Sequence, residues 1–204
     1  MDSYCDKNSF VFQKTLTSRY KPCVVEQLDD KRFVVGTYEL VEPDTELAKK
    51  YIDKDLKRIN RRAGSLEIID ELMNLTEVYE CYHGGVFALK ALHDRLIVAH
   101  ANGVLAIYTC DPIHLLLSFE TNSMMLTSID WFFFGNHYIY YTGGSCGTLS
   151  CIQEHSKSIL DKIQELPVLK EPIWMVNTKL PFLDGRPLVL IGSEDAKWRI
   201  LDHW

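Results

Sequence analysis

The stretch RLIVAHANGVLAIYTCD, from Arg95 to Asp111, decides the fold of this chain. It places two runs of apolar, β-forming residues on either side of Asn102-Gly103, a dipeptide that favours the tight turn of a β-hairpin. The same succession of strand, turn and strand recurs in YIYYTGGSCGTLSCIQ (138–153) and LVLIGSEDAKWRILD (188–202). Three hairpins of one kind are therefore predicted, and they point to a repeat protein.

A further strand is predicted ahead of each hairpin, beginning near Val86, Thr127 and Ile173. These starts lie about 41 and 46 residues apart, close to the ~40–45-residue period of WD repeats, in which each repeat forms one four-stranded blade of a β-propeller. Outer strands are indicated by EVYECYHGG (77–85), HLLLSFETN (114–122) and SILDKIQEL (158–166). We therefore predict an all-β fold, a WD-repeat β-propeller with about four blades and an incomplete ring.

The first copy of the repeat is interrupted. Its strands are supplied by PCVVEQL (22–28), RFVVGTYEL (32–40) and GSLEIIDEL (64–72), and an insertion from Val41 to Ala63 separates the last two. Because the insertion is rich in charge, we expect an exposed loop or a short surface helix that lies outside the sheets. The alternative is a basic docking site formed by Lys54, Lys57, Arg58, Arg61 and Arg62.

The repeats divide the chain into blades at about 22–80, 81–122, 123–168 and 169–204. The last blade reaches Trp204 without an outer strand. Four such blades do not close a propeller comfortably, so we expect a fragment, a short isoform or one half of an assembly. Its open sheet edge predicts self-association.

Composition narrows the class of function. The net charge is -6 and the pI is about 5.6, which argues against a nucleic-acid surface, because such surfaces need clustered Lys and Arg. The six cysteines form no C-x-x-C pair, so no metal site is indicated. No signal peptide or membrane span is evident in the sequence. We expect a protein of the cytoplasm or nucleus, assigned here to the cytoplasm, with a protein or a cationic group as partner.

Several segments, taken in order, resemble one WD-repeat family, the diphthine methyl ester hydrolases, also called diphthine methyltransferases. The family's V-G-T-Y-x-L strand is matched by Val35–Leu40, and its G-x-L-x-(I/L) strand by Gly64–Ile68. Its L-S-L-D-W opening is similar to Leu126–Trp131, and its fourth blade resembles Ile173-Trp174 followed by Gly192–Asp202. The family carries a His and an acid shortly before that Trp, whereas this chain has Glu171 and no His.

The resemblance implies hydrolysis of the methyl ester of methylated diphthine on translation elongation factor 2, a step of diphthamide biosynthesis, with no cofactor. The substrate carries a quaternary ammonium, which aromatic rings and acids bind. The substrate-binding candidates are Trp131, Trp174 and Glu171. Both Trp residues also suit core positions on leading strands. Because the family's later blades are missing, we expect residues 1–204 alone to be weakly active or inactive.

The catalytic residues stay unassigned, and five candidates remain open: Asp195, Arg199, Glu194, His100 and Ser145. Asp195 equally suits a structural role in its turn. His100 aligns with Gly143 and Gly192 of the later copies, where it could act as a general base or as a core histidine. Ser145 lies in G-G-S-C-G, which spells the G-x-S-x-G of serine esterases, but a hairpin turn explains this motif as well. A non-catalytic scaffold for protein binding is the alternative function.

Overall fold

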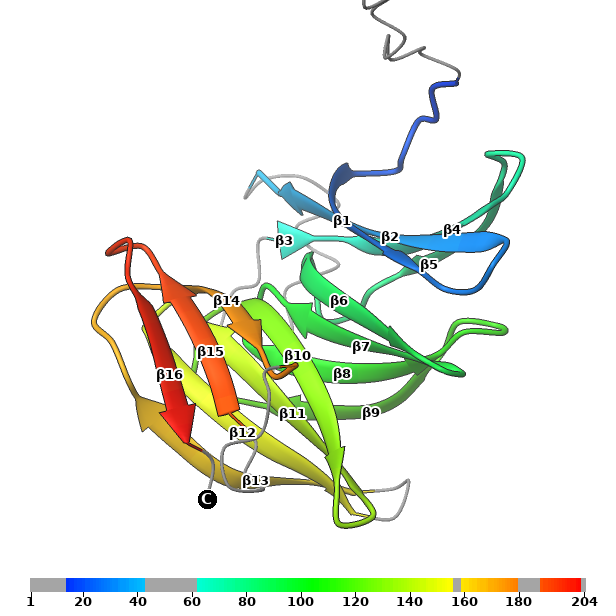
Figure 1. Cartoon of the computed structure of the whole chain (residues 1–204). Helices are drawn as coiled ribbons and strands as arrows, with labels where there is room; N and C mark the ends of the chain where they lie inside the picture. The colour runs from blue at the N-terminus through cyan, green and yellow to red at the C-terminus, as the bar shows by residue number, and fades with distance from the viewer. Residues whose placement is uncertain (1–13, 43–61, 156–158, 180–187, 203–204) are drawn as a thin grey trace, which may run out of the picture.

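The computed structural model describes residues 14–42, 62–155, 159–179 and 188–202. In these ranges the regular secondary structure is entirely β-strand, arranged in four antiparallel sheets (Figure 1). The sheets follow one another along an open arc, and the main contacts between sheets join consecutive ones through strands β1, β6, β10 and β14. The all-β fold and the incomplete ring are therefore confirmed.

Each sheet is one blade, and its strands run in chain order from the leading strand outward. Blade 1 contains β1 (Lys21–Gln27), β2 (Arg32–Leu40), β4 (Ser65–Asp70) and β5 (Leu75–Glu80), with β3 (Arg62–Ala63) beside β2. Blade 2 contains β6 (Val86–Leu92), β7 (Arg95–His100), β8 (Val104–Thr109) and β9 (Leu115–Glu120). Blade 3 contains β10 (Leu126–Phe134), β11 (His137–Gly144), β12 (Thr148–His155) and β13 (Ile159–Pro167), and blade 4 contains β14 (Ile173–Asn177), β15 (Leu188–Ser193) and β16 (Trp198–Asp202).

The insertion is shorter than the sequence indicates. Arg62 and Ala63, which we placed outside the sheets, form β3 and pair with Leu40 and Glu39 of β2. Ala63 is fully buried and packs with Tyr20 and Val41. Residues 43–61, including Lys54, Lys57, Arg58 and Arg61 of the possible basic docking site, lie outside the described residues.

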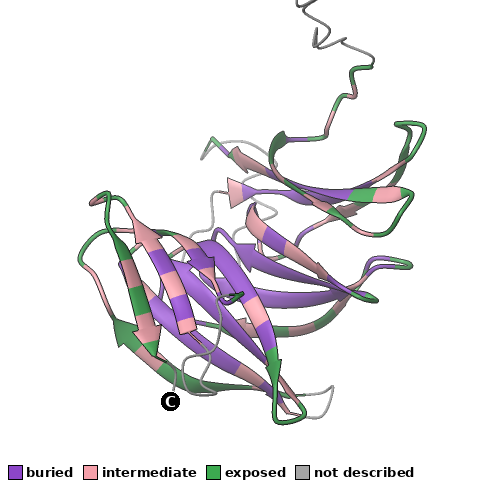
Figure 2. Cartoon of the chain, in the orientation of Figure 1, coloured by how far each residue is buried: buried purple, intermediate pink, exposed green. Residues whose placement is uncertain are grey.

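Apolar side chains between consecutive blades form the core. Figure 2 shows that the buried residues are concentrated on the strands in the middle of the arc. We call the side of a blade that contacts the next blade along the chain its forward face, and the opposite side its back face. Leu66, Leu105 and Leu149 hold the same position on the forward faces of blades 1, 2 and 3, as strand register shows. All three are buried by the blade that follows. Blade-on-blade packing therefore supplies the hydrophobic stabilisation of the arc.

The turns that join the second and third strands of blades 2, 3 and 4 share one backbone geometry. Gly103, Gly147 and Ala196 each have a positive φ, of 83°, 77° and 59°. Each also donates its N–H to the carbonyl three residues earlier, over 3.1–3.2 Å. Glycine adopts this conformation readily, whereas the Cβ of alanine makes it costly. Blade 4 therefore carries local strain that the other two turns avoid.

We predict that Ala196→Gly raises the free energy of unfolding by about 1 kcal/mol, because it removes the Cβ from a left-handed position. The reciprocal change, Gly103→Ala, should lower it by about 1–2 kcal/mol. Urea unfolding of the three proteins, followed by tryptophan fluorescence, measures both differences. Equal destabilisation by the two changes would contradict this account of the turns.

A buried ion pair crosses between blades 2 and 3. The Arg95 Nη1 donates to Glu154 Oε1 over 2.7 Å, and the Tyr140 hydroxyl donates to Glu154 Oε2 over 2.6 Å. The side chains of Arg95 and Glu154 are only 11% and 3% exposed. A carboxylate in such a place is tolerated because both of its oxygens are bonded.

We predict that Arg95→Met lowers the free energy of unfolding by about 3–5 kcal/mol, because it leaves the Glu154 charge buried without its cation. Adding Glu154→Gln should restore part of that loss, since the amide is neutral and its oxygen still accepts from Tyr140. Chemical denaturation of the single and double variants is the measurement. A double variant less stable than Arg95→Met would show that the charge is not the source of the penalty.

Candidate functional site

On one side of the arc, the strands of every blade end in the turns between second and third strands and in the connectors between blades. We call this side the loop end; it comprises turns 101–103, 145–147 and 194–197 and connectors 81–85, 121–125 and 168–172. Each connector donates to the residue just before β4, β8 or β12 in the blade it leaves: Cys81 N to Gly64 O, Thr121 N to Gly103 O and Val168 N to Gly147 O, over 2.9–3.1 Å. It also accepts from the turn of the blade it enters: Ala101 N to Gly85 O, Ser145 N to Met125 O and Glu194 N to Pro172 O. The backbone of the loop end is therefore fixed in a repeating pattern.

Blade 4 brings most of the candidate site residues together at the loop end. Glu171 lies on its connector and Trp174 on β14, while Glu194, Asp195 and Arg199 belong to the turn and the start of β16. The Glu194 N–H donates to Pro172 O, which fastens the turn to the connector. Glu171 and Glu194 are exposed, and Trp174 is 50% exposed. This corner therefore presents carboxylates and an indole ring to solvent.

Asp195 and Arg199 hold the β15–β16 turn together. Arg199 donates from Nη2 to Asp195 Oδ2 over 2.5 Å and from Nη1 to Oδ1 over 3.1 Å. Asp195 also accepts from the Ser193 hydroxyl and from the Lys197 N–H. Hydrogen bonds from Arg199 and then from Ser193 hold the pKa of Asp195 well below its usual range. Such a carboxylate is a poor proton acceptor, so these contacts fit a structural task.

His100 lies inside blade 2. The register of β7 and β8 places it level with Gly144 and Ser193, one residue beyond the alignment with Gly143 and Gly192 that the sequence indicates. Its Nδ1 is 3.0 Å from Gly84 O and its Nε2 is 2.9 Å from the Tyr108 hydroxyl. Burial, followed by the proximity of His83, lowers the pKa of His100 to about 3. The ring is therefore neutral and enclosed, which suits packing rather than contact with a substrate.

Ser145 and Trp131 occupy structural surroundings. Ser145 lies in the turn between antiparallel strands β11 and β12, not in the strand-to-helix turn that activates an esterase serine. Trp131 is partly buried against the core between blades 2 and 3 and packs edge-on against Tyr138, with ring centroids 5.8 Å apart. Of the two Trp candidates, Trp174 is thus the one at the exposed corner.

A thiol next to Ser145 was missed by the sequence reasoning. The Cys146 Sγ lies 3.4 Å from the Ser123 hydroxyl and 3.1 Å from the Thr148 hydroxyl. Partial burial acts to raise the pKa of Cys146, but hydrogen bonds to Ser123 and Thr148 outweigh it and lower the pKa. The spacing of Cys146 and Thr148 was visible in the sequence, whereas the approach of Ser123 depends on the docked connector.

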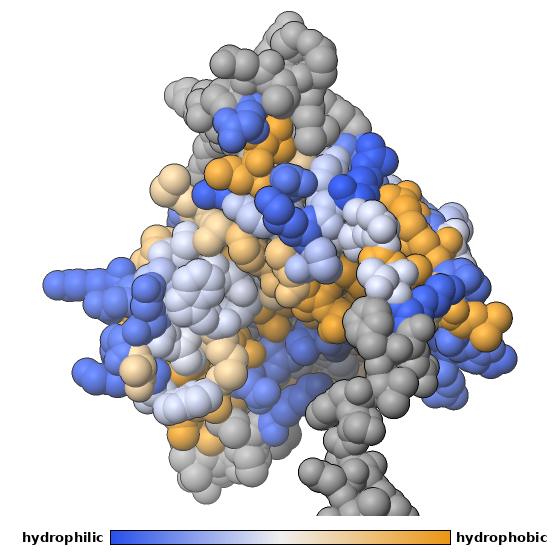
Figure 3. All heavy atoms as spheres, turned by 90° about the horizontal axis from the view of Figure 1, so that it is seen from above, coloured by the Kyte–Doolittle hydropathy of each residue, from blue (hydrophilic) through white to orange (hydrophobic). Residues whose placement is uncertain are grey.

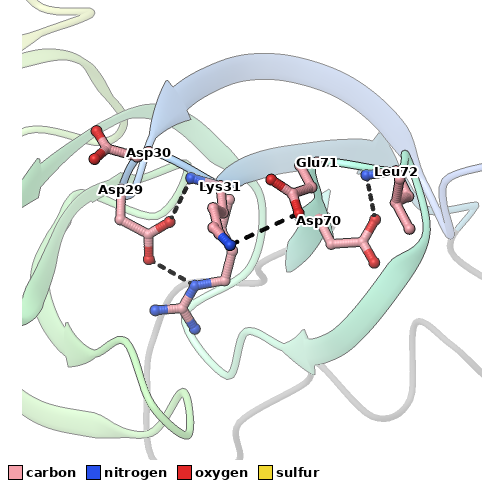
Figure 4. Close-up of a pocket in the computed structure, with 7 residues that line it drawn as sticks. Asp29, Asp30, Lys31, Asp70, Glu71 and Leu72 are labelled. Carbon is pink, nitrogen blue, oxygen red and sulfur yellow. Dashed lines mark hydrogen bonds and ion pairs between the residues drawn. The ribbon is translucent and has the colours of Figure 1, made fainter.

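A charged hollow lies at the opposite end of blade 1, between the β1–β2 and β4–β5 turns (Figure 4). Its ionic groups largely pair with one another: Arg32 Nε lies 2.7 Å from Asp29 Oδ2, and Lys31 Nζ lies 3.9 Å from Glu71 Oε1. Across the part of the chain that the structure describes, no group of three or more His, Cys, Asp or Glu residues is arranged to hold a metal ion. No helix in that part is long and apolar enough to cross a membrane.

We predict that His100 makes the protein less stable in mild acid. Its pKa of about 3 in the folded state lies below the ~6.5 of an exposed histidine, so between these values the unfolded chain binds one more proton. Stability from this group is complete above pH ~6.5 and is lost as the pH falls through that window. From pH 7 to pH 5, urea unfolding should show a loss about 2 kcal/mol larger for the wild type than for His100→Gln. Equal losses would contradict the assignment.

Comparisons with known proteins show the fold. No protein-family model and no curated protein matches the sequence. The computationally designed Ika4 protein is similar at 14% identity, over 95% of this chain and 100% of that chain, with a TM-score of 0.65. The WD40 β-propeller domain of Doa1 is similar at 12% identity, over 90% of this chain and 51% of that chain, with a TM-score of 0.65. The designed Ika8 protein aligns at 14% identity over 86% of this chain and 44% of that chain, with a TM-score of 0.57. The described residues thus form an arc of a WD-repeat type β-propeller that spans about half the length of the Doa1 and Ika8 chains.

Proposed function

We propose that this protein hydrolyses the methyl ester of methylated diphthine on translation elongation factor 2. Water adds to the ester carbonyl carbon, the bond from that carbon to the methoxy oxygen breaks, and the products are a carboxylate, methanol and a proton. The proposal rests on the family resemblance of Val35–Leu40, Leu126–Trp131 and Gly192–Asp202. These segments fall in blades 1, 3 and 4, the order that the resemblance requires.

The corner of blade 4 at the loop end suits the cationic part of this substrate. A quaternary ammonium cannot donate a hydrogen bond, so a protein binds it by an aromatic face and by negative charge. The half-exposed ring of Trp174 and the exposed carboxylate of Glu171 lie three residues apart on the same connector and strand. Glu171 also stands where the resembled family carries an acid ahead of this Trp. We assign both residues to binding of the ammonium group.

The hydrolytic step needs a group that accepts a proton from water and donors for the oxyanion. Asp195 is engaged by Arg199, and His100 is enclosed. Glu194, exposed on the same turn, is the remaining candidate acceptor among the residues singled out from the sequence. We propose that it faces the ester while Glu171 and Trp174 hold the ammonium group.

A non-catalytic scaffold is the second candidate function. It is favoured by the contacts of Asp195, Arg199 and His100, each of which holds a turn or a blade end in place. In that case the fixed loop end binds a protein partner without changing it, as the propeller fold permits.

We predict that the complete protein releases methanol from elongation factor 2 that carries methylated diphthine, while residues 1–204 alone release it weakly or not at all. Glu171→Gln and Trp174→Ala should each lower kcat/KM by about 10-fold, because a cation–π or charge contact is worth about 0.5–2 kcal/mol. Their unfolding curves should match the wild type, since both side chains are exposed. Methanol and the mass of the modified peptide are the measurements, and Glu71→Gln, at the opposite end of blade 1, is the matched control.

Asp195→Asn gives a different outcome if the turn is structural. The melting temperature should fall, and activity should fall only as far as the folded fraction does. A loss of turnover of about 100-fold with an unchanged melting curve would instead place Asp195 in the chemistry. A protein that binds the factor but leaves the ester intact supports the scaffold.

A further inference from the structure

The forward face of blade 4 is apolar and uncovered. Trp198 and Ile200 are 66% and 62% exposed on β16. Strand register makes them equivalent to side chains that are buried in the other three blades. The equivalents of Trp198 are Leu66, Leu105 and Leu149, and those of Ile200 are Ile68, Ile107 and Cys151. Blade 4 therefore presents the same kind of surface that blades 1 to 3 each bury against a neighbour.

The back face of blade 1, at the other end of the arc, is exposed in the complementary way. Val25 on β1 and Phe33 on β2 are 60% and 39% exposed. Their equivalents on the back faces of blades 2, 3 and 4 are all buried. For Val25 these are Leu89, Ile129 and Val176, and for Phe33 they are Leu96, Tyr140 and Val189. The two ends of the described arc thus present complementary faces, of the kinds that pack against each other between consecutive blades.

We propose that two copies of this chain close one ring, with the forward face of blade 4 in each copy packed on the back face of blade 1 in its partner. Each seam continues the interface that already joins blades 1 to 4, with Trp198 and Ile200 in the places of Leu105 and Ile107. The surface seen from above carries exposed apolar residues between hydrophilic ones (Figure 3). Neighbouring exposed apolar side chains, such as Trp198 and Ile200, are typical of interaction surfaces.

The number of copies follows from the size of the arc. The chain aligns with 51% of the Doa1 propeller domain, so two arcs of this length supply the blades of one ring. A forward face on a back face is a head-to-tail contact, and such contacts end either in a closed ring or in an open chain. An arc of about half a ring closes with two copies, and the dimer then has two identical seams.

Analytical ultracentrifugation of the 204-residue protein tests the proposal. The wild type should sediment as a species of about 47 kDa, twice the 23.6 kDa of one chain. Ile200→Glu should damage the forward face and Val25→Glu the back face, so each variant alone should sediment at 23.6 kDa. Met124→Glu, at a 73% exposed loop-end residue, is the matched control and should remain dimeric. All three side chains are largely exposed, so each variant should fold. The circular dichroism spectra should match that of the wild type, and the two monomeric variants should have the same unfolding curve.

Mixing the two variants tests the head-to-tail geometry. One copy keeps an intact back face and the other an intact forward face, so one seam re-forms and a 1:1 dimer should reappear. Its Kd should be at least about 100-fold weaker than that of the wild type, because the second seam no longer closes within the same complex. A wild type that is monomeric at every concentration overturns the proposal. So does a trimer, an open chain, a dimer insensitive to both variants, or a mixture that stays monomeric.

Discussion

Burial of the forward face of each blade by the next blade is the interaction on which the rest of this structure depends. A single four-stranded sheet has no second layer, so its apolar faces leave water only against a neighbouring sheet. Leu66, Leu105 and Leu149 are buried for that reason, and Trp198, in the same position, is exposed because no blade follows it among the described residues. The spacing of the connectors, and with it the geometry of the loop end, follows from this stacking.

In blades 1, 2 and 4, the residue at the end of the second strand or just beyond it on the register carries a polar side chain, whereas blade 3 has Gly144 there. Blade 1 has Thr37, whose hydroxyl oxygen accepts the Ser65 N–H over 2.8 Å. Blade 2 has His100 against Tyr108. Blade 4 has Ser193, which bonds to Asp195 and Arg199. Each solution satisfies buried or half-buried polar groups locally, which the stacked core requires. In these three blades the position therefore keeps the same role, local satisfaction of polar groups, with different residue types.

Local pattern accounts for the parts of the fold that were predictable. Continuous runs of apolar, β-forming residues on either side of Asn102-Gly103 favour a hairpin whatever its neighbours are, so the strands appear where they were expected. The pairing of Ala63 with β2 was missed because it joins segments across a long insertion and leaves no local signal. The sequence alignment of His100 with the later repeats was wrong by one residue. Ala99 and His100 could each be aligned with a glycine, Gly143, so the sequence alone did not fix the register. The residue types at the candidate site could be predicted from the sequence. Their hydrogen-bond partners could not, because these depend on how the connectors between blades pack against the turns.

Several polar side chains at the loop end are not available for catalysis, because they form the hydrogen bonds that stabilise its turns. Asp195, Arg199 and His100 are engaged by neighbouring groups, whereas Glu171 lies on a connector whose backbone already fixes it. Polar side chains on such connectors can change without loosening a turn, so substrate recognition is most easily gained there. Trp174 and Glu171 also lie in the blade whose forward face is uncovered. The proposed seam therefore joins the blade that carries this corner to a second copy of the chain.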